Sequence, residues 1–175
     1  MNLRKLKQDD APLMLEWMHS KETVKHLQNN FTDMSIVDCQ SFIKASENDV
    51  QNLHMAIVDD NNSYVGTVSL KHIDRLKNTA EFAIVIRPCY MGRKFSKYAM
   101  TEILKIGIED LKLNKIYWCV SRENQRAIRF YDKNGYHRTQ IEAWEVEDNY
   151  TAAQVDSFIW YSIEKGSFIA GSRPC

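Results

Sequence analysis

Residues 84–96 read IVIRPCYMGRKFS, and this stretch decides the fold because three patterns meet in it. Its first three residues end an almost continuously apolar run that starts at Ala80, as expected of a strand buried on both faces. Pro88 stops that strand, and a short turn with one glycine and two cations follows. From Phe95 to Leu111 apolar residues recur every three to five positions, which predicts a long amphipathic helix. The stretch therefore predicts a buried strand that turns directly into a helix.

The turn within this stretch has the character of a phosphate-binding site. At the start of a helix, free backbone amides and the positive end of the helix dipole face the same point, so a pyrophosphate can be held mainly by main chain. Arg93 and Lys94 add positive charge beside Gly92. On this pattern alone, an ordinary tight connection with two solvated cations is an equally good interpretation.

Outward from this stretch the chain alternates between strand and helix patterns. We expect strands at 3–6, 53–58, 64–70, 80–86, 115–120, 136–146 and 155–163, and helices after Asp9-Asp10, from Ser35, over 95–111 and over 124–133. Residues 20–34 lack a clean period and are expected to form a loop. The turn-forming run Asp59-Asp60-Asn61-Asn62 predicts that the second and third strands form a hairpin. This order predicts an α/β (α+β) fold with a mixed sheet and about four flanking helices.

Length and composition limit the class of protein. A chain of 175 residues suits one domain, expected to span 1–165 with a flexible tail at 166–175. The 23 basic residues balance 23 acidic ones, so we expect no nucleic-acid and no membrane partner. No apolar run approaches the roughly 20 residues of a membrane span, and no signal-peptide pattern opens the sequence, so a cytoplasmic location is expected. The four cysteines and five histidines show no ligand spacing, which predicts reduced thiols and no metal site.

A second informative segment, residues 124–136, reads NQRAIRFYDKNGY. Asn124 is a good N-cap residue and Asn134-Gly135 is a common helix stop, so the boundaries of this helix are well defined. Tyr131 lies two turns after Asn124 on the same face, roughly 10 Å away along the axis. Its hydroxyl could serve a leaving group, although an apolar core stripe on this helix explains the same spacing.

These two segments, in this order, resemble the sequence patterns of the GNAT acetyltransferase superfamily, especially its branch that acetylates the amino termini of ribosomal proteins. The family pattern Val-x-Pro-x-x-(Gln/Arg)-Gly-x-Gly-x-(Gly/Ala) is matched by Ile86, Pro88, Gly92 and the basic Arg93. The later pattern, Asn-x-x-Ala-x-x-x-Tyr-x-Lys-x-Gly-(Phe/Tyr), is matched by Asn124, Ala127, Tyr131, Lys133, Gly135 and Tyr136. Met91, Lys94 and Ser96 differ from the first pattern, and we expect these differences to affect coenzyme affinity and acyl-chain preference rather than the fold.

The resemblance spans residues 1–165 and implies a GNAT-type central sheet of about seven strands, mostly antiparallel, with a central splay. It implies acetyl-coenzyme A as co-substrate, whose pantetheine arm would run beside residues 84–86 as an added pseudo-strand, opposite residues 115–120. The coenzyme-binding residues that it implies are Ile84, Val85, Ile86, Met91, Gly92, Arg93, Lys94, Phe95, Ser96, Asn124 and Lys133. Tyr131 would lie near the coenzyme sulfur and act as general acid.

An amine must be neutral to attack a thioester, yet an alkyl ammonium has a pKa near about 10, so the reaction requires a base. Glu81 is our candidate, because its carboxylate is the only ionisable group in the apolar strand 80–86. A Glu81 that lies at the wet end of the strand and pairs with a cation explains the sequence equally well.

The chain is therefore expected to be an N-acetyltransferase that moves an acetyl group from acetyl-coenzyme A to a primary amine by direct attack. We favour a small-molecule acceptor such as an amino sugar or a polyamine. Two alternatives stay open, namely acetylation of protein amino termini and a coenzyme A-binding module without turnover. Acceptor choice is expected to depend on residues 20–34 and 144–153. The acidic residues Glu142, Glu145, Glu147 and Asp148 could attract a cation there or simply face solvent. A monomer or a homodimer is expected.

Overall fold

A seven-stranded sheet runs through the computed structural model, which describes residues 1–168. Its strands are β1 (Asn2–Lys5), β2 (Leu53–Val58), β3 (Tyr64–Asp74), β4 (Thr79–Ile86), β5 (Lys115–Ser121), β6 (His137–Thr139) and β7 (Phe158–Glu164). They are arranged in the order β1-β2-β3-β4-β5-β7-β6. Every neighbouring pair is antiparallel except β4 and β5, which are parallel. The predicted mixed and mostly antiparallel sheet is confirmed.

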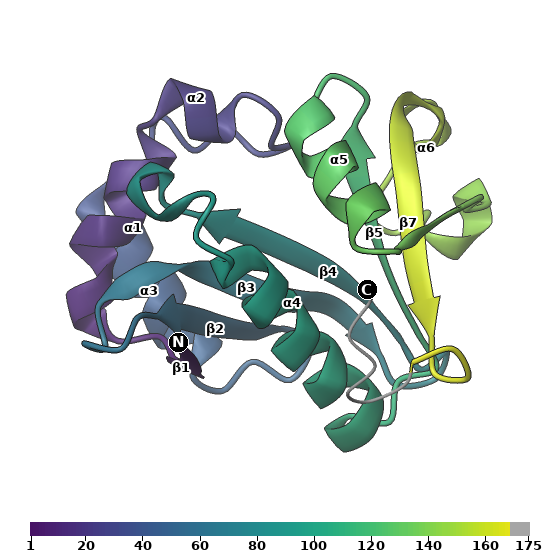
Figure 1. Cartoon of the computed structure of the whole chain (residues 1–175), viewed down its shortest axis with the longest axis horizontal. Coiled ribbons are helices and arrows are strands. Elements are labelled where there is room, and N and C mark those ends of the chain that lie inside the picture. Colours follow the sequence, from purple (N-terminus) through teal and green to yellow (C-terminus); the bar gives the residue numbers. More distant parts are fainter. Residues whose placement is uncertain (169–175) are drawn as a thin grey trace.

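Helices cover both faces of the sheet (Figure 1). Within residues 1–168 the α-helices are α1 (Ala11–Met18), α2 (Lys21–Val24), α3 (Ile36–Ser46), α4 (Phe95–Lys105), α5 (Gln125–Lys133) and α6 (Ala152–Ser157). Short 3-10 segments form at Gln8–Asp10, Pro88–Tyr90 and Ala143–Glu145, and a π-helical turn, Ile106–Asp110, extends α4. Helices α4 and α5 pack on one face, whereas α1 and α3 pack on the other. The four predicted helices are all present, and α2 and α6 are additional.

Local sequence explains where two of these helices begin. The Ser35 hydroxyl accepts the amide of Asp38, and the Asp38 carboxylate accepts the amide of Ser35 at 2.8 Å, so the two residues form a capping box for α3. The side chain of Asn124 accepts the amide of Ala127 at 3.1 Å and caps α5. The polar residues before each apolar stripe therefore start both helices, as the sequence predicts.

Trp118 of β5 is the centre of the core beneath α4 and α5. It is 1% exposed, and its ring centroid lies 5.4 to 5.8 Å from those of four aromatic neighbours, Phe82, Tyr131, Tyr136 and Tyr161. On the opposite face, α1 and α3 pack against β2, and residues 140–157 cover β5 and β7. The sheet is thus buried on both faces at its middle, where β4 and β5 meet.

Replacing Trp118 by Ala is expected to lower the free energy of unfolding by about 3–5 kcal/mol, because a large buried ring would leave a cavity. Trp118→Phe should cost much less, since the indole Nε1 has no acceptor among the described residues and phenylalanine therefore loses no hydrogen bond. Denaturant unfolding of the two variants measures the difference. Equal losses of unfolding free energy in the two variants would show that the shape of the indole ring, rather than the volume that it fills, stabilises this core.

The two late strands predicted at 136–146 and 155–163 are wrong in extent. Only β6 pairs within the first range, and α6 occupies the start of the second. Thr151 begins α6 with a capping box, which the alternating pattern did not reveal. The apolar residues between β6 and α6 pack as irregular chain on Tyr117 and Trp160. Their apolar character therefore reflects burial of an irregular segment and not strand pairing.

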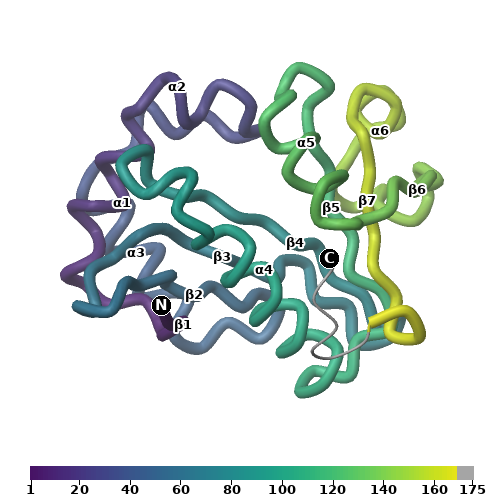
Figure 2. Tube along the Cα trace, in the orientation of Figure 1, coloured from purple at the N-terminus to yellow at the C-terminus, as the bar shows by residue number. Residues whose placement is uncertain are grey.

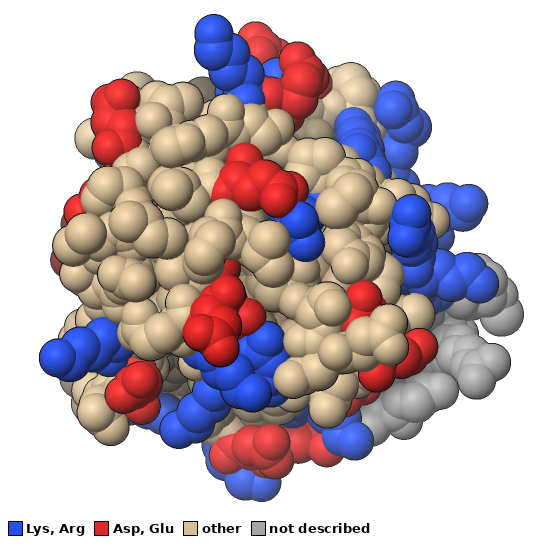
Figure 3. All heavy atoms as spheres, turned by 90° about the vertical axis from the view of Figure 1, so that its left-hand side faces the viewer, with Lys and Arg blue, Asp and Glu red and all other residues tan. Residues whose placement is uncertain are grey.

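Residues 20–34, predicted as a loop, include the four-residue helix α2. The predicted tail, 166–175, lies mainly outside the described residues. In the part of the chain that the structure describes, no helix is both long enough and apolar enough to cross a bilayer. On the face formed by α1 and α3, acidic and basic side chains are interspersed among uncharged ones (Figure 3).

Candidate active site

Strands β4 and β5 pair only where they begin. Their parallel pairing joins Thr79–Glu81 to Lys115–Tyr117, and beyond it the two strands separate toward their carboxyl ends (Figures 1 and 2). On the side of β5, the backbone of residues 82–86 therefore faces an opening in the sheet, whereas its other edge stays paired with β3. This opening is the predicted splay, and Ile84, Val85 and Ile86 lie along its β4 edge.

The turn after β4 presents a run of free amides. The backbone N–H groups of residues 92–97, including that of Ser96, donate no hydrogen bond to any acceptor within residues 1–168. Gly92 and Lys94 have φ angles of +80° and +68°, a left-handed conformation that glycine adopts readily and lysine rarely. Lys94 is also the N-cap of α4, so the free amides lie at the positive end of that helix dipole. The turn can therefore hold an anion through its main chain.

The side chains of this turn have different surroundings. Arg93 and Lys94 are exposed, whereas Phe95 is buried beneath α4 and only its amide is available. Met91 is half-buried, and its Sδ lies 2.6 Å from Nη1 of Arg126 at the start of α5. The two segments that carry the family patterns are thus in contact across the splay.

Helix α5 places its predicted residues at different distances from the turn. Asn124 starts the helix, next to the contact with Met91, although its side-chain oxygen is already bonded as the cap. Lys133 is exposed at the other end, about 14 Å further along the axis. The structure therefore brings Asn124 to the turn and does not bring Lys133 there.

Tyr131 belongs both to the core stripe and to the site. Its ring packs on Trp118 and Tyr161, with centroid distances of 5.4 and 5.1 Å. Its hydroxyl makes no hydrogen bond within residues 1–168. Burial raises the pKa of Tyr131, and the neighbouring Cys119 adds to the increase. The phenol therefore keeps its proton at neutral pH, as a general acid must. A place in the core stripe of α5 is compatible with that role.

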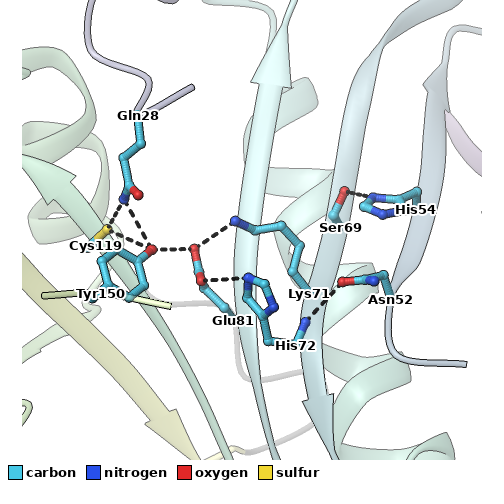
Figure 4. Close-up of polar contacts among 9 residues, drawn as sticks. All are labelled: Gln28, Asn52, His54, Ser69, Lys71, His72, Glu81, Cys119 and Tyr150. Carbon is cyan, nitrogen blue, oxygen red and sulfur yellow. Dashed lines mark hydrogen bonds and ion pairs between the residues drawn. The ribbon is translucent and has the colours of Figure 1, made fainter. Parts of the chain in front are cut away.

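Glu81 is a buried carboxylate where the splay begins (Figure 4). Its Oε1 accepts a hydrogen bond from Tyr150 Oη at 2.9 Å and pairs with Lys71 Nζ, also at 2.9 Å. Its Oε2 is buried without a hydrogen-bond donor in the described chain, and His72 Nε2 lies 3.8 Å away. Glu81 thus pairs with a cation, Lys71, as the alternative interpretation of the sequence expects. It does not lie at a wet strand end, however, because it is buried and keeps one oxygen free.

Five residues that sequence reasoning missed surround this carboxylate: Gln28, Lys71, His72, Cys119 and Tyr150 (Figure 4). Lys71 lies directly opposite Glu81 in the antiparallel register of β3 and β4, and the sequence pattern alone does not set that register. Gln28 and Tyr150 come from irregular segments, and no spacing in the sequence relates them to β4.

The segments 20–34 and 144–153, expected to govern acceptor choice, both reach the cluster. Gln28 Nε2 donates to Tyr150 Oη and to Cys119 Sγ, each at 3.1 Å. Burial raises the pKa of Cys119 to about 11, so its thiol is neutral at pH 7. Among the acidic residues of the second segment, Glu145 is paired with Lys115 at 2.9 Å and is not a free anion.

A cleft of about 210 Å³ opens beside Tyr117, on the same face as Glu81. Two lysines, Lys77 and Lys115, and the exposed Trp144 contribute to its walls. Within residues 1–168, no three His, Cys, Asp or Glu side chains are grouped closely enough to hold a metal ion.

A splayed sheet, a turn of free amides and a buried carboxylate together define the acetyltransferase class that the sequence predicts. The family model for the acetyltransferase (GNAT) domain matches residues 1–137, and the chain belongs to the GNAT acetyltransferase family.

Similar proteins agree with this assignment. A spermidine N(1)-acetyltransferase of Escherichia coli (strain K12) is 34% identical over 80 residues, which cover 46% of this chain and 43% of that protein. The match thus spans less than half the length of that relative. Acetyltransferase PseH of Campylobacter jejuni is 21% identical over 135 residues, or 77% of this chain and 82% of that one. A Vibrio cholerae spermidine N-acetyltransferase, crystallised with CoA and spermine, has a TM-score of 0.79 at 21% identity, covering 94% and 95% of the two chains, and shows the same fold.

Proposed function

We propose that this protein transfers the acetyl group of acetyl-coenzyme A to a primary amine of a small molecule, and that the acceptor is a polyamine of the spermidine type. The observation that carries the proposal is the free oxygen of a buried Glu81, placed at the base of a splay whose far end is an anion-binding turn. The printed activities of the Escherichia coli and Vibrio cholerae relatives support the choice of acceptor.

The coenzyme would be held mainly by main chain. The free amides from Gly92 to Lys97 would bind the diphosphate, with Arg93 adding charge. The pantetheine arm would lie against the unpaired edge of residues 84–86. A thioester extended in this way points toward Tyr131 and Cys119, which lie where β5 leaves β4.

The acceptor would bind from the opposite face, with its ammonium at Oε2 of Glu81. Tyr150 and Lys71 hold Oε1, so the carboxylate is fixed in orientation before the acceptor arrives. Oε2 removes a proton from the ammonium, and the neutral nitrogen attacks the thioester carbonyl carbon. The carbon–sulfur bond breaks, and the departing thiolate takes the proton of the Tyr131 hydroxyl. The attacking nitrogen then loses its second proton to the Tyr131 phenolate, which restores the hydroxyl.

A panel of amines with acetyl-coenzyme A, followed by thiol release, tests this proposal. Spermidine is expected to react faster than an amino sugar or a peptide amino terminus. A preference for the peptide would favour acetylation of protein amino termini. Binding of coenzyme A without thiol release from any amine would identify a binding module and contradict the proposal.

Tyr131→Phe is expected to lower kcat by about tenfold to a hundredfold without abolishing turnover, because proximity of amine and thioester supplies much of the acceleration. The melting temperature should not change, since the lost hydroxyl bonds no described residue. Steady-state kinetics and thermal unfolding of the same preparation separate the two effects. An unchanged kcat would remove Tyr131 from the mechanism.

A further inference from the structure

The reaction proposed above releases one proton at each turnover, because an ammonium and a thioester become an amide and a thiol. Glu81 can take that proton, but its side chain is only 5% exposed. While the acceptor or its product fills the site, a base so deeply buried cannot return the proton to solvent along the path of the acceptor, and it must be free again before the next acceptor binds. The site therefore needs a route for the proton between Glu81 and water.

His72 is placed to provide this route (Figure 4). Its Nε2 lies 3.8 Å from the free Oε2 of Glu81, and 41% of its side chain is exposed. No described residue donates a hydrogen bond to that oxygen. His72 therefore contacts both solvent and the oxygen that we assign to the acceptor amine.

The backbone of His72 is held in an unusual conformation. Its φ is +51°, in the left-handed region that a residue with a β-carbon rarely adopts. The pairing of β3 with β4 is interrupted between Lys71 and Asp74, as in a bulge that turns a side chain toward a new direction. Asn52 Oδ1 accepts the amide of His72 at 3.0 Å, and Asp49 holds the other end of that Asn52 side chain at 2.8 Å. The surrounding structure thus fixes the backbone from which this imidazole extends beside Glu81.

The protonation state of His72 suits an acceptor of protons. Burial lowers the pKa of His72 from its usual value; Glu81 on β4 opposes this change and Lys71 on β3 adds to it. Asn52, which contacts His72 from the segment before β2, carries no charge. The ring is therefore neutral at pH 7. When the pH falls below this lowered pKa, the ring is already protonated and can accept no further proton. Proton transfer through His72 would therefore be lost at acid pH and kept at neutral pH.

We propose that His72 carries the acceptor's proton from Glu81 to solvent. The amine gives its proton to Oε2 of Glu81, a small movement of the half-exposed imidazole brings Nε2 within hydrogen-bonding reach, and Nε2 accepts that proton. The imidazolium then moves back toward solvent and loses the same proton from Nε2 to water, so Nε2 is free to accept again in the next turnover. His72 acts through Glu81 and does not touch the acceptor, and this role rests on the proposed function.

His72→Gly tests the relay, because glycine tolerates the positive φ and leaves room for a small base. In dilute buffer its kcat is expected to fall by about tenfold or more, with the KM for acetyl-coenzyme A unchanged. Added imidazole should restore kcat in proportion to the concentration of its neutral form. His72→Asn, which also accepts the left-handed backbone but fills the space, should be slow and should not recover.

His137→Gly is the matched control, since His137 is an exposed histidine on β6 outside this cluster. Its kcat should equal that of the natural protein and should not respond to imidazole. The relay is overturned if His72→Gly keeps the natural kcat in dilute buffer, or if it is slow and imidazole leaves it slow. If the natural protein releases thiol and either of those results is found, the relay alone is refuted. If no amine leads to thiol release by the natural protein, the proposed function itself is refuted.

Discussion

Replacing Glu81 by Gln is expected to lower kcat by about a hundredfold to ten-thousandfold, which is the usual contribution of a positioned base. The amide cannot take a proton from the acceptor ammonium, although it can still accept the Tyr150 hydrogen bond at the position of Oε1. Because the proposed coenzyme site lies at the other end of the splay, the dissociation constant of coenzyme A should change little. Steady-state kinetics with spermidine and calorimetric titration with coenzyme A measure the two quantities.

The matched control is Glu145→Gln, which removes a carboxylate that is also paired with a lysine but lies on the cleft wall beside Tyr117. Its kcat should remain within about threefold of the natural value, since a half-exposed ion pair contributes little. A Glu81→Gln variant that stays folded, binds coenzyme A and turns over at the natural rate would remove Glu81 as the base. Equal losses in both variants would indicate a general effect of charge.

Replacing Lys94 by Pro is expected to weaken coenzyme A binding by about tenfold to a hundredfold. Proline cannot adopt the φ of +68° found here, and it has no amide to donate. The loss of one hydrogen bond to a charged diphosphate is worth about 1.5–3 kcal/mol. Calorimetric titration gives the dissociation constant, and circular dichroism of α4 and the other helices shows whether the variant is folded.

Lys94→Gly is the comparison that decides the cause. Glycine keeps the amide and accepts the left-handed backbone more readily than lysine, so only the exposed ammonium is lost. Its dissociation constant is expected to stay within about fivefold of the natural value, because an exposed charge contributes less than about 1 kcal/mol. If the glycine variant binds as weakly as the proline variant, the side chain and not the main chain grips the diphosphate.

The position of Lys94 also shows where family patterns and local physics diverge. The family pattern has glycine at this position, and the sequence alone raises the question whether a lysine can take its place. The structure answers it by placing Lys94 in the same left-handed region as Gly92. The strain is tolerated because the residue lies at the junction of a turn and a helix, where the chain direction must change.

By itself, the sequence determined the elements with strong periodicity and clear ends. The strand 80–86, the long helix after Pro88 and the helix capped by Asn124 were all predictable, because burial on one or both faces and helix capping act over a few neighbouring residues. The same local signals singled out the turn that presents free amides and, through the family resemblance, the candidate acid Tyr131. They failed at residues 140–157, where apolar side chains pack without pairing.

Only the tertiary structure decided how Glu81 is surrounded. Lys71 reaches it from the neighbouring strand, His72 through a bulge held by Asn52, and Tyr150 from an irregular segment 69 residues away in the chain. These contacts depend on strand register, on the splay and on the path of a segment without regular structure, none of which a local pattern encodes. Sequence reasoning could therefore single out Glu81 as a candidate base, whereas its free oxygen and the proposed route from it to solvent depend on the folded chain.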